Sequence, residues 1–190
     1  MDVIKFEIDG PLLLTPVRHG DDRGFVSETF SLRRLEEHTG PLCIVQDNHT
    51  LSRAAGTLRG LHFQAPPMAQ AKLIRVVRGA AYDVAVDIRV GSPTYGRHVA
   101  VELSAANWQQ LWIPQGFAHG FLTLEPDTEL EYKLTTHYSA EHDRGIAWND
   151  PDLAISWPLH VGGPLLSHKD GAQPAFSKLP AYFQWSPGQK

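Results

Sequence analysis

Short segments in which apolar and polar residues alternate predict most of the secondary structure of this chain. In residues 83–88 the order Asp-Val-Ala-Val-Asp-Ile places the valines and the isoleucine on one face of a strand and the carboxylates on the other. Further segments rich in β-branched and aromatic residues lie between turn-forming residues, at 12–17, 73–77, 82–88, 98–103, 110–113 and 129–135. Many short strands between frequent turns are typical of an all-β sandwich or barrel.

Only one segment has the helical period. Residues 32–37 read Leu-Arg-Arg-Leu-Glu-Glu, and Ser31 precedes them as a helix cap. From Pro151 onward the chain is rich in Pro, Trp and Gly, which predicts irregular structure laid over the barrel. We expect a single domain over residues 1–190, with 151–190 as a C-terminal extension that packs on the barrel.

Composition narrows the class of protein. The 190 residues are 42% hydrophobic, enough for one well-buried core, and no stretch is long and apolar enough to cross a bilayer. The 17 basic and 21 acidic residues are dispersed, which argues against a nucleic-acid or anionic-membrane surface. A single cysteine, Cys43, excludes an intramolecular disulfide, and the N-terminus lacks the features of a signal peptide, so we expect a cytoplasmic protein.

Two segments carry a histidine among glycines and apolar residues. They are 56–64, with His62, and 114–121, with His119, and their spacing is that of the two halves of a cupin metal motif. The usual second histidine is replaced by Gln64, and the expected acidic position falls near Met68 and Ala69. Two imidazoles are fewer ligands than a divalent transition metal requires, so we predict a cupin-like barrel with a polar pocket and no metal.

Alternate residues of a small barrel point inward, and polar residues that do so line a ligand site. Gln46 and Asn48 are two apart, as are His62 and Gln64, so each pair can share one face of a strand, either the inner face or the face toward solvent. We place His62 inward.

Taken together, these segments resemble the dTDP-4-dehydrorhamnose 3,5-epimerase family of metal-independent cupins. The resemblance runs from about Asp21 to Asp170. The matching pieces are 22–25 with Glu28, 46–48, 58–64, 72–73, 83–89, 112–121, 132–133, Tyr138, 148–151 and 167–170. The family implies a cupin or jelly-roll β-barrel and chemistry on a dTDP-4-keto-6-deoxyhexose, with no cofactor.

The resemblance also implies catalytic roles. A base removes a proton beside the 4-carbonyl to give an enolate, and an acid on the other face returns one with inverted configuration. His62 matches the base and Asp170 the carboxylate that orients it. Tyr132 matches the proton donor, and Lys72 matches the cation that stabilises the enolate.

Other matched positions imply substrate binding. Arg23 and Arg59 match contacts to the pyrophosphate, for which arginine is well suited. Further matches lie around the thymidine or the sugar: Glu28, Gln46, Asn48, His119, Tyr138 and Lys169. Asp143 stands where many members have glutamate, which puts its contact in doubt. In the family barrels Arg23, Phe25 and Glu28 can come from a partner subunit, which implies a homodimer built by strand exchange.

Alternatives remain open at this stage. The same base and acid serve relatives that epimerise only C3 or only C5 of a related sugar. Two alternatives belong to other functional classes. One is a metal-dependent cupin with His62 and His119 as ligands, and the other is a non-catalytic sugar-binding cupin. Inversion at both C3 and C5, toward dTDP-L-rhamnose, is the expectation we carry forward.

Overall fold

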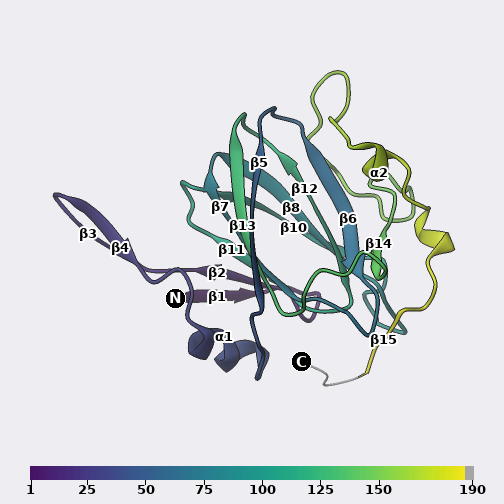
Figure 1. Cartoon of the computed structure of the whole chain (residues 1–190), viewed down its shortest axis with the longest axis horizontal. Helices are drawn as coiled ribbons and strands as arrows, with labels where there is room; N and C mark the ends of the chain where they lie inside the picture. Colours follow the sequence, from purple (N-terminus) through teal and green to yellow (C-terminus); the bar gives the residue numbers. More distant parts are fainter. Residues whose placement is uncertain (187–190) are drawn as a thin grey trace.

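The computed structural model describes residues 1–186, in which two antiparallel sheets face each other (Figure 1). From edge to edge, the six-stranded sheet contains β1 (Asp2–Lys5), β2 (Leu12–Thr15), β11 (Gln110–Ile113), β7 (Lys72–Arg78), β13 (Thr128–Leu134) and β5 (Gln46–Ser52). The five-stranded sheet contains β10 (His98–Ser104), β8 (Ala80–Asp87), β12 (Phe117–Thr123), β6 (Leu58–Gln64) and β14 (Asp143–Gly145). The all-β, jelly-roll expectation is confirmed.

The remaining elements are short. They are the hairpin strands β3 (Arg18–Asp21) and β4 (Gly24–Ser27), the parallel pair β9 (Arg89–Val90) and β15 (Phe183–Gln184), the helices α1 (Leu32–Thr39) and α2 (His168–Gly171), and a 3₁₀ turn at Phe176–Lys178. No helix within residues 1–186 has the length and apolarity needed to span a bilayer.

The predicted strands are present, with small differences at their ends. The segment expected at 12–17 forms β2 only as far as Thr15, because Pro16 has no N–H to continue a ladder. Ser31 occupies the N-cap of α1 as predicted, but its side chain makes no capping hydrogen bond. Its backbone carbonyl instead accepts from the amide of Leu35, at 3.0 Å.

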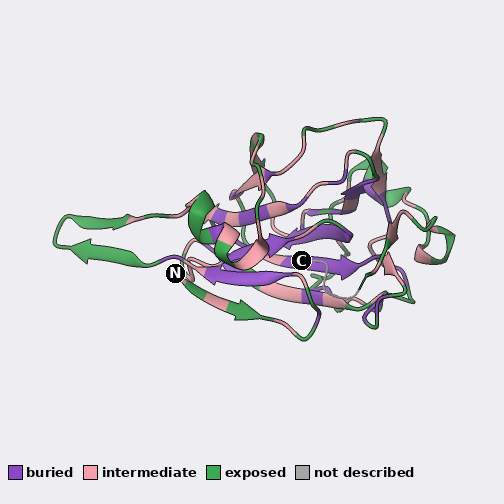
Figure 2. Cartoon of the chain, turned by 90° about the horizontal axis from the view of Figure 1, so that it is seen from below, coloured by how far each residue is buried: buried purple, intermediate pink, exposed green. Residues whose placement is uncertain are grey.

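Apolar side chains fill three layers, because alternate residues of each sheet face opposite sides. The layer between the sheets contains Ile74 and Leu111 from one sheet and Ala85 and Phe121 from the other, and Tyr132 packs against it. The purple strands of Figure 2 show this buried interior.

Each sheet is also covered on its outer side. α1 packs Leu35 onto the outer face of the six-stranded sheet, beside Trp112. The outer face of the five-stranded sheet is covered by the C-terminal segment through Leu153 and Trp157. This is the packing expected of the extension over residues 151–186, and residues 187–190 of that expectation lie outside the described residues.

The β3–β4 hairpin projects away from the barrel (Figure 1) and is almost wholly exposed (Figure 2). Phe25 is 52% exposed and Val26 76% exposed. The base of the hairpin is fixed to the barrel through Trp108. The indole N–H of Trp108 donates to Oγ of Ser27 at 3.1 Å. The ring of Phe25 stands edge-on to that of Trp108, with 5.0 Å between the ring centroids. Exposed apolar side chains on a projecting hairpin are available for contact with another protein surface.

Candidate active site

A bulge in β6 brings two polar side chains to the interior. Arg59 pairs with Phe121 of β12, whereas His62 pairs with His119, so three steps along β6 match two along β12. An extra residue in one strand reverses the facing of the residues that follow it. Arg59 and His62 therefore both face inward, although their spacing would put them on opposite faces of a regular strand.

Two glycines let the strands approach at this bulge. Gly60 has a φ of +133°, and a Cβ added to it would lie 2.5 Å from Cα of Gly120. A Cβ added to Gly120 would lie 2.9 Å from the carbonyl oxygen of Arg59. A side chain at either position would push β6 away from β12, so the two glycines help to set where His62 lies.

His62 and Asp170 form a hydrogen-bonded pair. Nε2 of His62 lies 2.6 Å from Oδ1 of Asp170, which α2 presents to β6. Burial lowers the pKa of His62 below its usual 6.5, and the negative charge of Asp170 acts in the opposite direction. Because Asp170 accepts the proton on Nε2, the imidazole lone pair lies on Nδ1, which is buried and has no hydrogen-bond partner within the part of the chain described.

His119 has its own carboxylate. Its Nε2 lies 3.0 Å from both oxygens of Asp83 on β8, and Asp83 is fully buried. Our sequence reasoning quoted Asp83 within the family match but gave it no role in the site. The signal was present, because Asp83 and Asp87 are the only charged residues of an otherwise apolar strand, and Asp83 lies on the inward face.

Lys72 lies at the end of β7, opposite Ile113 and Leu134 of the flanking strands. Burial lowers its pKa from 10.5 to about 8, while the charges of Asp83 and Asp143 act in the opposite direction. The charge of Lys72 also contributes to lowering the pKa of His62. Lys72 is thus an interior cation within electrostatic range of the His62 pair.

Tyr132 comes from the six-stranded sheet, which faces the sheet that carries His62. On β13 it pairs with Ile74 of β7 and with Asn48 of β5, and it packs against the interior apolar layer. Because Ile74 and Lys72 are two apart on β7, Tyr132 and Lys72 share the inner face of the six-stranded sheet. His62 is on the inner face of the other sheet, so the phenol and the imidazole approach the interior from opposite sides.

Asp143 joins two of the expected binding residues. Its Oδ2 accepts the hydroxyl hydrogen of Tyr138 at 3.1 Å and also contacts the ammonium of Lys169. The hydrogen bond to Asp143 raises the pKa of Tyr138 above 10. Although one methylene shorter than glutamate, Asp143 thus reaches both neighbours, and Tyr138 and Lys169 remain exposed.

Two amides hold the segment that carries Tyr138. Gln46 accepts from the backbone N–H of Tyr138 at 2.9 Å and donates to Oδ1 of Asn48 at 2.9 Å. Gln64, at the position of the missing metal ligand, donates to the carbonyls of Met68 and His137 and accepts from the amide of Ser139. Gln64 is therefore a structural residue whose hydrogen-bonding capacity is used, a role that sequence reasoning missed.

Three expected binding residues do not reach the site within one chain. Arg23 and Phe25 lie on the projecting hairpin, where Arg23 is paired with Asp21. Glu28 follows the hairpin and is paired with Arg34 of α1 at 3.2 Å. Within the single chain, hydrogen bonds and an ion pair join Gln46, Asn48, Tyr138, Asp143 and Lys169. Arg59 and His119 face the interior from β6 and β12, whereas Arg23, Phe25 and Glu28 do not.

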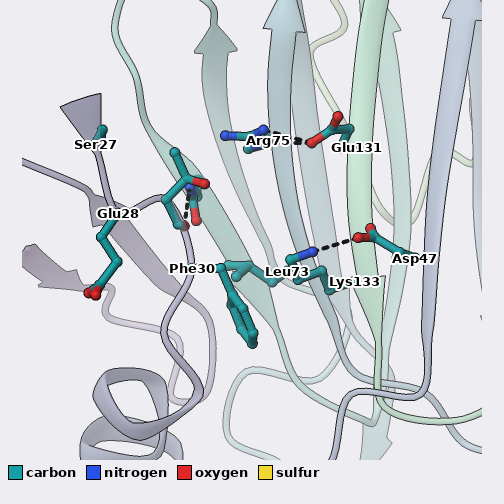
Figure 3. Close-up of a pocket in the computed structure, with 10 residues that line it drawn as sticks. Ser27, Glu28, Phe30, Asp47, Leu73, Arg75, Glu131 and Lys133 are labelled. Carbon is teal, nitrogen blue, oxygen red and sulfur yellow. Dashed lines mark hydrogen bonds and ion pairs between the residues drawn. The ribbon is translucent and has the colours of Figure 1, made fainter. Parts of the chain in front are cut away.

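Glu28 borders a cavity of about 340 Å³ on the outer face of the six-stranded sheet (Figure 3). Its cations are already paired, Arg75 with Glu131 and Lys133 with Asp47. The outward-facing residues of β7 and β13 that line it alternate with Lys72 and Tyr132, so this cavity and the candidate active site are on opposite sides of one sheet. It is therefore separate from the interior chemistry.

The arrangement lacks the donor set of a metal centre. Among residues 1–186, no three His, Cys, Asp or Glu side chains are grouped so that they could hold a metal ion. The nitrogens that face Asp170 and Asp83 are used in hydrogen bonds to these carboxylates.

Comparison with known proteins gives a consistent family. The family model described as dTDP-4-dehydrorhamnose 3,5-epimerase matches residues 5–178. Over 173 residues the chain is 53% identical to the dTDP-4-dehydrorhamnose 3,5-epimerase of Sinorhizobium fredii, and the match covers 91% of this chain and 88% of that relative.

Solved structures agree. The dTDP-4-dehydrorhamnose 3,5-epimerase of Bacillus anthracis, with TDP and PPi bound, is 49% identical with a TM-score of 0.88, covering 92% of this chain and 98% of that one. The dTDP-6-deoxy-D-glucose-3,5-epimerase of Legionella pneumophila, in complex with dTDP-4-keto-L-rhamnose, is 42% identical with a TM-score of 0.93, covering 97% of this chain and 98% of that one.

Proposed function

The chain belongs to the dTDP-4-dehydrorhamnose 3,5-epimerase family, and we propose that His62 and Tyr132 carry out the proton transfers of that family's reaction in its interior. The enzyme is an isomerase. It inverts C3 and C5 of dTDP-4-dehydro-6-deoxy-D-glucose to give dTDP-4-dehydro-L-rhamnose, in the synthesis of dTDP-L-rhamnose.

The reaction depends on the 4-carbonyl, which acidifies the hydrogens on C3 and C5. The imidazole of His62 takes one of these protons, and the electron pair of the broken C–H bond moves into an enolate. Asp170 stabilises the imidazolium that forms, because its carboxylate already accepts from Nε2. The ammonium of Lys72 stabilises the enolate oxygen, where a preorganised positive charge favours the transition state over the neutral ketone.

Inversion needs a donor on the other side of the sugar. The observation that supports this role for Tyr132 is its place on the inner face of the six-stranded sheet, opposite the sheet that carries His62. A phenol is neutral at working pH and can give up a proton to the enolate carbon. A sugar held between the two sheets then loses a proton to one face and gains one from the other.

The nucleotide and the sugar hydroxyls need further partners. Arg59 supplies a guanidinium for the pyrophosphate, and its Nε lies 3.4 Å from Oγ of Ser52. Tyr138 and Lys169 are exposed and joined through Asp143, so they can contact the nucleotide end. Gln46, Asn48 and His119 complete the proposed binding set.

The same proposal includes a homodimer. Arg23, Phe25 and Glu28 would enter the site of a second copy, which agrees with their distance from the site of their own chain and with the exposed apolar side chains of the hairpin. A complementation experiment tests this. Chains carrying His62→Ala and chains carrying Arg23→Ala are each expected to be poorly active, and co-expression should restore activity because each hybrid dimer has one site with both native residues. Activity no higher than that of the separate variants would argue against strand exchange.

We also propose that residues 1–190 fold as one domain and act in the reducing cytoplasm, the latter in keeping with one free cysteine, Cys43. The C-terminal segment shares an apolar cluster with the five-stranded sheet, so unfolding should be a single transition. Two separate calorimetric transitions would contradict a single domain, and recovery of the protein outside the cytoplasm on fractionation would contradict the location.

Incubation with dTDP-4-dehydro-6-deoxy-D-glucose in deuterated water tests the reaction. NMR should show deuterium at both C3 and C5 with the wild-type enzyme and at neither carbon with His62→Ala. The matched control is His160→Ala, because His160 is exposed and lies outside the site. Exchange at an undiminished rate in His62→Ala would refute His62 as the base.

The same experiment separates the alternatives. Label at only one carbon identifies a single-site epimerase. No label despite binding of the nucleotide sugar identifies a sugar-binding protein. Exchange that requires a stoichiometric iron, nickel or manganese in the purified protein identifies a metal-dependent cupin.

A further inference from the structure

The carboxylate of Asp170 is held at both oxygens. Oδ1 lies 2.6 Å from Nε2 of His62 and accepts from the backbone N–H of Gly60 at 3.2 Å. Oδ2 accepts from the hydroxyl of Ser167 at 2.6 Å. Ser167 is the only hydrogen-bond donor to Oδ2 among residues 1–186, and the side chain of Asp170 is only 7% exposed.

Ser167 uses its hydroxyl in two directions. As the N-cap of α2 its Oγ accepts from the backbone N–H of Asp170 at 3.1 Å, while its O–H donates to Oδ2 of the same residue. A hydroxyl has one hydrogen to donate. Ser167 therefore holds both the backbone and the side chain of Asp170, and it fixes the direction in which Oδ1 points.

We propose that Ser167 is a positioning residue for the base, which acts by holding the carboxylate of Asp170 turned toward Nε2 of His62. The proposal rests on the proposed role of His62. The bond between Ser167 and Oδ2 is short, at 2.6 Å, and the carboxylate that accepts it is only 7% exposed. Without it, the outer oxygen of a buried carboxylate loses its partner.

The effect reaches His62 through charge. The charges that act on the imidazole come from three neighbouring elements: Asp170 and Lys169 of α2, Lys72 of β7 and Asp143 of β14. The titratable group that faces His62 across the strands is His119 of β12, which is paired with Asp83. Asp170 is the largest contribution that raises the pKa of His62 against burial. If the carboxylate of Asp170 turns away from His62, it raises the pKa of His62 less. That pKa then falls further, and His62 becomes a poorer base.

Ser167→Ala tests the proposal, with Ser167→Thr as the conservative variant that keeps both the acceptor and the donor. Ser167 is exposed, so an added methyl group has room. The matched control is Ser31→Ala, because Ser31 is also an N-cap serine but makes no side-chain capping bond. The measurements are the pH profile of kcat/KM, the imidazole titration of His62 by NMR and the melting temperature of each variant.

We expect Ser167→Ala to lose about tenfold in kcat/KM at its plateau. Its acid limb should move to lower pH, because that limb follows His62 in the free enzyme, and the NMR titration of His62 should move the same way. Ser167→Thr should restore both the plateau and the limb. A merely structural role would lower the melting temperature and the plateau without moving either titration.

Wild-type rates and an unchanged acid limb in Ser167→Ala would overturn the proposal, and so would a loss of rate with no shift in the titration. Either result leaves the base assignment intact if His62→Ala is inactive in the same assay. Full proton exchange by His62→Ala would instead remove the premise. The two failures are therefore distinguishable.

Discussion

His62 and His119 are direct cross-strand neighbours, and each imidazole meets a different carboxylate through Nε2. The two pairs differ in geometry. One oxygen of Asp170 bonds to His62, whose Nδ1 has no hydrogen-bond partner within residues 1–186. Both oxygens of Asp83 lie at 3.0 Å from His119, which fixes that ring. The pairing suits His62 to proton removal and His119 to holding the substrate.

Asp83→Asn should weaken catalysis through Lys72 as well as through His119. The charge of Asp83 is the largest influence that raises the pKa of Lys72 against burial, so the neutral amide should lower that pKa below about 8. The alkaline limb of kcat/KM should then move to lower pH, with a loss of about tenfold at the plateau. An alkaline limb at the wild-type position in a pH profile would show that Asp83 does not act on Lys72.

Lys72 should set the alkaline limit of the wild-type enzyme. Its cation is needed, and its pKa of about 8 means that the cation is present below that pH and is lost above it. Since the pKa of His62 is below 6.5 and its neutral form is needed, kcat/KM should be bell-shaped between the two.

The variants of Lys72 check the assignment. Lys72→Arg should keep activity to higher pH, because a guanidinium stays charged. Lys72→Met should lose roughly 10²–10³-fold in kcat/KM, since a fixed charge near the enolate is removed. A pH profile of Lys72→Arg that still falls near pH 8 would assign the alkaline limb to another group.

Tyr132→Phe should separate the two proton transfers. Removal of the proton by His62 needs no phenol, so exchange of deuterium from solvent should continue in the NMR assay. Formation of the inverted product should fall by about 10²–10⁴-fold, because the donor on the opposite side is lost. The control is Tyr95→Phe, since Tyr95 packs on Phe176 outside the site. Wild-type inversion by Tyr132→Phe would exclude the phenol as the acid.

Gly60→Ala should destabilise the protein by about 3 kcal/mol, because the new Cβ meets Cα of Gly120 at a backbone angle that alanine rarely adopts. The matched control is Gly171→Ala, where a Cβ meets nothing within 4 Å, and which should change stability little. Denaturant unfolding measures both. Equal stability of the two variants would mean that β6 can move away from β12 at little cost.

Much of the barrel could be predicted from the sequence, because period-two alternation between frequent turns is a local signal. The strand at 110–113 matches β11 at both ends, and 98–103 differs from β10 by one residue. Strict alternation, however, cannot place both Arg59 and His62 inward. The bulge that does so depends on the contact between Gly60 and Gly120, which are far apart in the chain.

The site was predicted in part for the same reason. Family motifs indicated His62 and Asp170, and the folded chain brings them into contact over 108 positions. The role of Asp83 was missed because its partner, His119, is on another strand. Ser167 was likewise matched only as part of a family motif. Its hydrogen bond to Asp170 depends on the folded chain, in which that carboxylate faces β6.

α2 carries Lys169 and Asp170 side by side, so the residue proposed to grip the nucleotide and the residue that supports the imidazole belong to one turn of backbone. Nucleotide binding at Lys169 would therefore bear on the position of Asp170, and through Asp170 on the imidazole of His62. A keto sugar without dTDP should consequently turn over slowly even at saturating concentration. The binding energy of the nucleotide lowers the barrier to proton removal as well as holding the substrate.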